Sequence, residues 1–251
     1  MGTSRDYKPP ASNAWRPDKR QLSKIPNIGP IPKLQLRGLL GNYIQGKGNG
    51  GPTAMAGSGG GGSAVSQAGL KTAARIGGFF GGISGEGLET TLRTLGFSNL
   101  IGKNASEIAQ TLLDTLAGTG VTGDDEDARK ALAELWIEIL EDAQTYEEVD
   151  EILSALCDEE SLSNILISFY GYYIFEQFWR VEFKIIADKV GNQKAEHLAN
   201  EMKDFVKEEL KDQICLLGKS ITAIDWQGNE GERICRQVME RTLYVFCPEE
   251  E

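Results

Sequence analysis

Proline and glycine are concentrated in the first third of this 251-residue chain. Seven of the eight prolines precede residue 53, in stretches such as YKPPASNAWRP and KIPNIGPIPK. Proline cannot continue an α-helix or a central strand, and it favours the extended polyproline II conformation. We therefore expect residues 1–84 to form a flexible arm with short helical pieces. One piece is expected where apolar residues recur at helical spacing, at Leu36, Leu39, Leu40, Tyr43 and Ile44.

Charge divides the chain at the same place. Residues 1–84 hold 11 of the 26 Lys and Arg residues and two of the 37 acidic residues, which gives a net charge of +9, whereas the remainder carries −20. Dispersed cations on a flexible arm could bind nucleic acid, but the acidic body would repel phosphate. We expect the arm to contact the body or a partner protein, with nucleic acid as an alternative partner.

A glycine-rich region joins the arm to the rest. GSGGGGSAVSQAG (residues 57–69) has the composition of a flexible linker, and the next stretch places Phe79 and Phe80 between glycine pairs. A run of this kind also occurs in membrane-perturbing peptides, but it is far shorter than the roughly 20 residues of a membrane span. We expect it to pack on the helical domain, and a membrane-perturbing effector stays an alternative.

Residues 85–251 show helical patterns, from Gly87 onward. NASEIAQTLLDTLAG begins with a cap at Asn104 or Ser106 and stops at Gly118. Leu88, Leu92 and Leu95 have helical spacing before Gly96. Further helices are expected over residues 124–143, 145–157, 161–191, 192–219 and 230–246. No segment alternates with a period of two, so the sequence predicts an acidic all-α domain of about six to eight helices.

The helix over residues 161–191 is the most apolar. Residues 161–175 carry no charge, and aromatic side chains from Phe169 to Phe183 cover most of the helix circumference. Fifteen uncharged residues are too few to cross a bilayer. We therefore expect no membrane span and place this helix at the centre of the core, from Ile165 to Ile186.

Phosphate-binding motifs are weak in this sequence. GKGNGG (residues 46–51) and GSGGGG (residues 57–62) both fit G-x-G-x-x-G, but neither follows a buried strand or opens a βαβ unit. A run of glycines fits this pattern by chance. We predict no cofactor.

The cysteines and the one histidine do not predict a metal or catalytic site. Cys157, Cys215, Cys235 and Cys247 are too widely spaced for CxxC, and His197 has no readable nucleophile or orienting partner. We expect Cys157 and Cys215 in the core, Cys247 exposed, and His197 on an ion-pairing surface. The N-terminus lacks the apolar segment of a signal peptide, so we predict a cytoplasmic location with reduced thiols.

Several stretches resemble the QatB family of Qat anti-phage defence systems. The resemblance rests on MGTS followed by Trp15, on RGLLGNYIQGKGNGG, TAARIGG and GLETTLRTLGFSNLIGKNASEI, and on the aromatic helix ISFYGYYIFEQFWRVEFKIIADKVG. It extends over nearly the whole chain. AGTGVTGDDEDARKAL keeps an acidic helix start but lacks a Cys-Pro that relatives often carry, and the arm lacks the long Ser/Gly/Pro run of relatives.

The resemblance implies a set of partners. They are an ATPase (QatA-like), a QueC-like enzyme (QatC-like) of deazaguanine chemistry and a TatD-like nuclease. A QueC-like enzyme activates a carboxylate on a deazaguanine base by adenylation, and a protein amine could capture that carboxylate. The resemblance thus implies a non-enzymatic defence component whose body docks the ATPase and whose arm is the acceptor for the QueC-like enzyme.

Gly2 is the candidate modification site. Removal of the initiator methionine exposes its α-amine, whose pKa of about 8 leaves it substantially neutral at cellular pH, whereas a lysine has a pKa of about 10.4. N-myristoylation would need Ser or Thr at position 6, which is Asp6. Two alternatives stay open: MGTS serves translation only, or proteolysis exposes an internal glycine of the arm.

Overall fold

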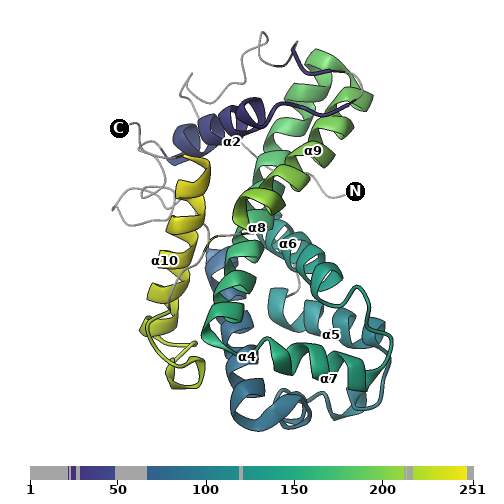
Figure 1. Ribbon diagram of the computed structural model, residues 1–251, viewed down its shortest axis with the longest axis vertical. Helices are drawn as coiled ribbons and strands as arrows, with labels where there is room; N and C mark the ends of the chain where they lie inside the picture. Colours follow the sequence, from purple (N-terminus) through teal and green to yellow (C-terminus); the bar gives the residue numbers. More distant parts are fainter. Residues whose placement is uncertain are drawn as a thin grey trace. The chain divides into compact units, whose positions relative to one another are not determined.

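The computed structural model describes residues 22, 24–26, 29–48, 67–118, 121–211, 213 and 217–247. These residues form eight α-helices, two short 3₁₀ helices and no strand, which confirms the all-α prediction (Figure 1). The α-helices are α2 (Lys33–Gly48), α4 (Gln67–Thr94), α5 (Ala105–Ala117), α6 (Gly123–Ile139), α7 (Tyr146–Ala155), α8 (Glu159–Val190), α9 (Asn192–Leu210) and α10 (Asn229–Phe246). The 3₁₀ helices are η2 (Ser98–Leu100) and η3 (Ile221–Ala223).

The chain divides into two compact units. We call residues 65–177 and 206–242 the central unit, and residues 1–64, 178–205 and 243–251 the terminal unit. The central unit holds α4 to α7 with the first part of α8, and the terminal unit holds α2 with the end of α8 and most of α9.

Helix α8 is the long buried helix that the aromatic segment predicts. Every residue from 171 to 178 is buried, and the rings of Phe169 and Tyr173 stack with centroids 6.0 Å apart. Aromatic side chains bury large apolar areas, so this helix contributes much of the hydrophobic stabilisation. Within the described ranges, no helix combines the length and apolar character that a membrane span requires.

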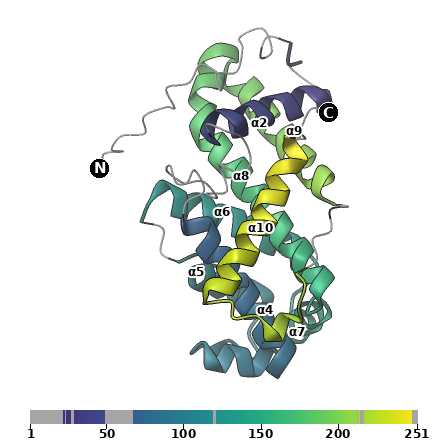
Figure 2. The ribbon, with the colours of Figure 1, turned by 90° about the vertical axis from the view of Figure 1, so that its left-hand side faces the viewer.

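Helix α4 begins at Gln67, well before the boundary expected after residue 84, which therefore falls inside a helix. The glycines that suggested a flexible arm permit close packing instead. A Cβ on Gly77 would lie 2.2 Å from the ring of Trp226, in the loop before α10. Figure 2 shows this loop in yellow-green, leading into the lower end of α10. Phe79 and Phe80 are buried, so the expectation that this stretch packs on the helical domain is confirmed.

Helices α5, α6 and α7 each pack on α4, and α5 also packs on α6 and on α7 (Figure 1). Their N-termini are capped by side chains: Asn104 accepts a hydrogen bond from the Glu107 amide, and Thr122 and Thr145 each form a capping box. Gly96 and Gly118 have φ angles of 87° and 78°, which explains why the chain turns at these two predicted stops.

In the terminal unit, α2 is the helical piece expected in the arm. Its five predicted apolar residues are all buried, and Tyr43 packs edge-on against Phe178 with centroids 5.4 Å apart. Leu22, Ile25 and Ile31 are also buried, so packed structure begins earlier than the arm prediction placed it. The hydrophobic side chains between the prolines cause this difference, because they add to the same core.

Candidate functional site

The predicted modification site, Gly2, lies outside the described residues, and so does the motif over residues 57–62. The other glycine motif, which begins at Gly46, starts inside the last turn of α2 and follows no strand. Its first three residues are therefore helical, unlike the loop of a dinucleotide site.

Of the described cysteines, Cys235 and Cys247 are buried, whereas Cys157 is half-buried and not in the core, contrary to the prediction. Burial raises the pKa of Cys157 and of Cys247 to about 11, and that of Cys235 to about 12. A thiol in this state is a poor nucleophile at neutral pH. Cys247 is buried, contrary to the prediction, because its Sγ donates to the Gly41 carbonyl oxygen at 3.3 Å, where glycine leaves room. Cys215 falls outside the described residues.

His197 has a structural contact that its sequence neighbours did not reveal. Its Nε2 donates to the Gly29 carbonyl oxygen at 2.7 Å, and one turn later Glu201 accepts the Ile31 amide at 2.9 Å. The histidine is half-buried, which corrects the prediction of an ion-pairing surface residue. In the described part of the chain, no group of three or more His, Cys, Asp or Glu side chains could hold a metal ion.

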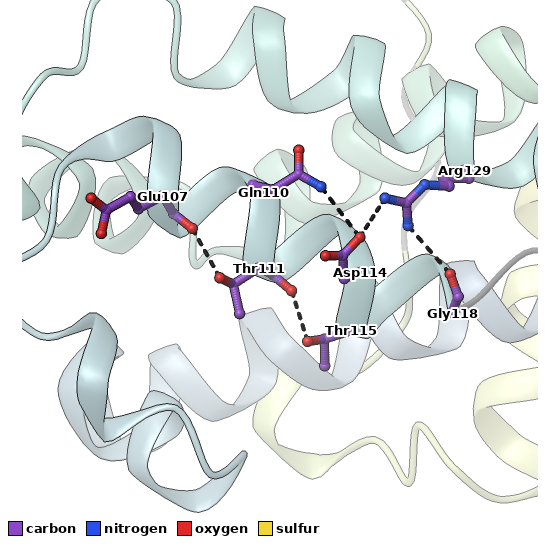
Figure 3. A network of polar contacts seen from close by, with 7 residues as sticks. All are labelled: Glu107, Gln110, Thr111, Asp114, Thr115, Gly118 and Arg129. Carbon is purple, nitrogen blue, oxygen red and sulfur yellow. Dashed lines mark hydrogen bonds and ion pairs between the residues drawn. The ribbon is translucent and has the colours of Figure 1, made fainter.

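A groove between α5 and α6 is the candidate interaction site of the central unit. A polar network fixes the two helices beside it (Figure 3). Arg129 of α6 pairs with Asp114 of α5 and donates to the Gly118 carbonyl oxygen at 3.4 Å. Gln110 donates to the same Asp114 carboxylate at 3.3 Å. The hydrogen bond from Arg129 lowers the pKa of Asp114, so this connection between the helices persists at neutral pH.

The groove has a volume of about 650 Å³, and its lining combines apolar and polar side chains. Its lining residues include Ala109 and Leu113 from α5 and Ala133, Trp136 and Ile137 from α6. Ile137 is 66% exposed, which is unusual for a large aliphatic side chain. Polar side chains occupy the rim: Asn104, Ser106, Gln110 and Gln144.

Trp136 lines the groove and also packs into the core of the central unit. Its ring packs edge-on against Phe79 of α4 with centroids 6.2 Å apart, and the side chain is almost fully buried. Its indole N–H finds no acceptor among the residues that the structure describes. A buried donor left unpaired costs free energy. Because this nitrogen is itself buried, the unpaired N–H belongs to the core beside the groove.

The charges around the groove are unbalanced. Lys103 and Lys130 of the central unit are paired with Glu107 and Glu126, at 3.2 and 3.8 Å. Lys103 lies at the end of the groove near the α6–α7 turn, because the Ala105 amide donates to the Gln144 carbonyl oxygen at 3.1 Å. At this same end, exposed Glu141 and Asp142 have no ion-pair partner in the described ranges. The sequence contains no Lys or Arg from residue 131 to residue 179. The end of the groove near the α6–α7 turn is thus negative.

A comparison with protein-family models identifies the family. The model of the Qat anti-phage system associated protein QatB matches residues 57–246, about three quarters of the chain. The chain belongs to the QatB family. It is thus a component of a Qat anti-phage system. The match covers α4 to α10, including both walls of the groove, and does not include the first 56 residues.

Two further comparisons gave no relatives. A search of curated proteins finds no match to the chain, and neither does a search of solved structures. The description of the QatB family names a defence system and no reaction. No site residue can therefore be transferred from a relative, and the groove is defined by geometry alone.

Sequence reasoning missed the groove. The signal that could have pointed to it is Ile137, an aliphatic residue that follows Trp136 and lies outside the predicted apolar stripe of Leu132, Leu135, Trp136 and Ile139. The groove itself depends on how α5 packs against α6, and that packing is not encoded in the periodicity of either helix.

Proposed function

We propose that this QatB-family protein is a non-enzymatic adaptor of its defence system. Its helical body docks the system's ATPase, and its N-terminal arm presents Gly2 as the acceptor for a QueC-like partner enzyme. The observation that carries the proposal is the contrast between a basic, proline-rich N-terminal segment that contains Gly2 and an acidic helical body.

The proposed reaction is an acyl transfer from an acyl adenylate to the Gly2 amine. The QueC-like enzyme consumes ATP, releases pyrophosphate and forms an acyl adenylate on the carboxylate of a deazaguanine base. The neutral α-amine of Gly2 attacks the acyl carbon, an amide bond forms, AMP leaves and the amine loses a proton. An α-amine with a pKa of about 8 is a better nucleophile at neutral pH than a lysine with a pKa of about 10.4.

Two properties of the arm support this role. Glycine has no side chain that would obstruct access to an enzyme pocket, and the prolines behind it favour an extended conformation. An extended chain loses less conformational entropy when it enters a pocket. Six prolines lie within the first 32 residues, so the arm is suited to threading into a partner.

A substitution at Gly2 tests the proposal in cells that carry the whole defence system. Gly2→Glu retains the initiator methionine and removes the glycine amine, so we expect phage protection to be lost while co-purification with the ATPase persists. Ser4→Glu makes the same charge change and keeps the amine, so it should protect. Full protection by Gly2→Glu would overturn the acceptor role.

The net charge of +9 over residues 1–84 favours one second candidate, a sensor or effector that binds nucleic acid. Binding of duplex DNA or RNA by the full chain should then fall steeply with salt. Replacing Arg16, Lys19 and Arg20 by Gln should weaken it further. Tight, salt-dependent binding that these substitutions abolish would favour this function over the acceptor role.

A further inference from the structure

We propose that the groove between α5 and α6 docks a cationic amphipathic helix from a partner protein. The proposal deepens the docking role given above and rests on it for the identity of the partner. It assigns the surface of the body and the chemistry of the occupant.

The shape of the groove suits a helix. Both walls carry small side chains, Ala105 and Ala109 on α5 and Ala133 and Ala143 on or after α6, which let another backbone approach closely. A volume of 650 Å³ accommodates a few apolar anchors rather than a whole domain. Helices present such anchors at i, i+3 or i+4 and i+7, the recurring pattern of recognition in a groove.

One large aliphatic side chain of the groove is left exposed. Ile137 is 66% exposed, so an apolar anchor seated beside it would remove apolar surface from water. Leu113 and Ala133 of the same lining are half-buried and add to the apolar surface that an anchor would cover.

The charged side chains near the groove favour a cationic occupant. The basic groups nearest the groove are Lys103, just before α5, and Arg129 and Lys130 on α6, and all three are already paired with carboxylates of the same unit. Glu141 and Asp142 at the α6–α7 turn have no cation paired with them in the described ranges. A cationic helix gains from these carboxylates, whereas an acidic segment or a nucleic-acid phosphate is repelled.

Site-specific photo-crosslinking tests the surface. Benzoylphenylalanine replaces Ile137 in the full chain, which is co-expressed with the ATPase, the QueC-like enzyme and the TatD-like nuclease of the same system. The control carries the same group at Val121, an 87% exposed aliphatic position of the central unit outside the groove. We expect a crosslink from position 137 alone, to a basic amphipathic segment of one of these three proteins.

Affinity measurements with the crosslinked protein test the chemistry. Ile137→Glu should weaken binding at least tenfold, and Val121→Glu less than twofold. Glu141→Lys with Asp142→Lys should also weaken it at least tenfold, whereas Glu147→Lys with Glu151→Lys on α7 should have little effect. Thermal unfolding of each variant verifies that it is folded.

The outcomes separate this proposal from the one on which it rests. If the ATPase co-purifies but no partner crosslinks at position 137, the groove assignment is overturned and the docking role stands. If the crosslinked protein is the QueC-like enzyme or the nuclease, the groove assignment stands and docking to the ATPase falls. A crosslink to an acidic segment, or to this chain itself, contradicts the proposed occupant.

Discussion

Glu182 is buried on α8, and its carboxylate has no hydrogen-bond partner in the part of the chain that the structure describes. Burial raises the pKa of this carboxyl to about 8, although Lys189, seven residues later on the helix, acts in the opposite direction. A carboxyl group without a partner in apolar surroundings favours its neutral form. At neutral pH the folded protein therefore holds a protonated Glu182.

This residue predicts a pH dependence of stability. The folded pKa lies above the ordinary value of 4.5, so the folded state binds the additional proton, and the stability contributed by this group falls as pH rises from 4.5 toward 8. Glu182→Gln should match the parent near pH 4.5 and exceed it by about 4 kcal/mol at pH 8.

Urea unfolding of both proteins at pH 5 and pH 8 measures the effect. Glu196→Gln, at an exposed position of α9, is the matched control and should change stability equally little at both values. A Glu182→Gln variant with the same pH dependence as the parent would show that the carboxyl is ionised or paired in the folded protein.

The surroundings of two residues could not be predicted from their neighbours in the sequence. Cys247 precedes a proline near the C-terminus, which suggested exposure, yet it lies against Gly41, which is 206 residues away in the sequence. His197 sits among charged neighbours on α9, yet its partner is the carbonyl oxygen of Gly29. Both partners are backbone carbonyl oxygens of segments that are distant in the sequence. The residue pattern of a single helix cannot predict such contacts.

At the scale of elements, α4 departs most clearly from its sequence signal. Glycine in a helix costs up to about 1 kcal/mol relative to alanine, so four glycines within six residues read as a helix breaker. These glycines are nevertheless helical, because the Trp226 ring packs closely against Gly77 and the Thr91 side chain packs closely against Gly82. Contacts made across the fold override the local propensity.

Alanine at two glycines of α4 should have opposite effects. Gly77→Ala would place a Cβ 2.2 Å from the Trp226 ring and should destabilise the protein by about 1–3 kcal/mol. Gly85→Ala meets nothing closer than 3.9 Å and should stabilise it by up to about 1 kcal/mol. Thermal unfolding measures both. Equal stability of the two variants would contradict the packing described for α4.

The other helices were predictable to the extent that their signals are local. The aromatic segment predicted α8, and the capping residue and the terminal glycine predicted α5. The groove beside α5 was not predictable, because it depends on the spacing between two helices. The position of Trp136 over Phe79 likewise needs the fold of α4, which the sequence pattern did not supply.

At the scale of the whole molecule, the chain combines a short basic segment with a larger acidic body. Leu22 and Ile25 are at most 1% exposed, so the body needs residues from Leu22 onward. Deletion of residues 2–20 should leave thermal unfolding unchanged, because the segment is too polar and proline-rich to add a core.

A longer deletion, of residues 2–26, should destabilise the chain, because each of the two buried side chains contributes about 1.5–3 kcal/mol. Thermal unfolding of both truncated proteins checks this boundary between arm and body. If the two deletions had the same effect, the burial of Leu22 and Ile25 would not matter for stability.

The central claim, that the arm is an acceptor at Gly2, is tested most directly by peptide-level mass spectrometry of the full chain. The chain is purified from cells with the complete defence system and from cells that lack the QueC-like enzyme. We predict loss of methionine in both samples and an added deazaguanine-type mass on the Gly2 amine in the first sample only. An unmodified Gly2, with no added mass on any other amine of the arm, would contradict the account.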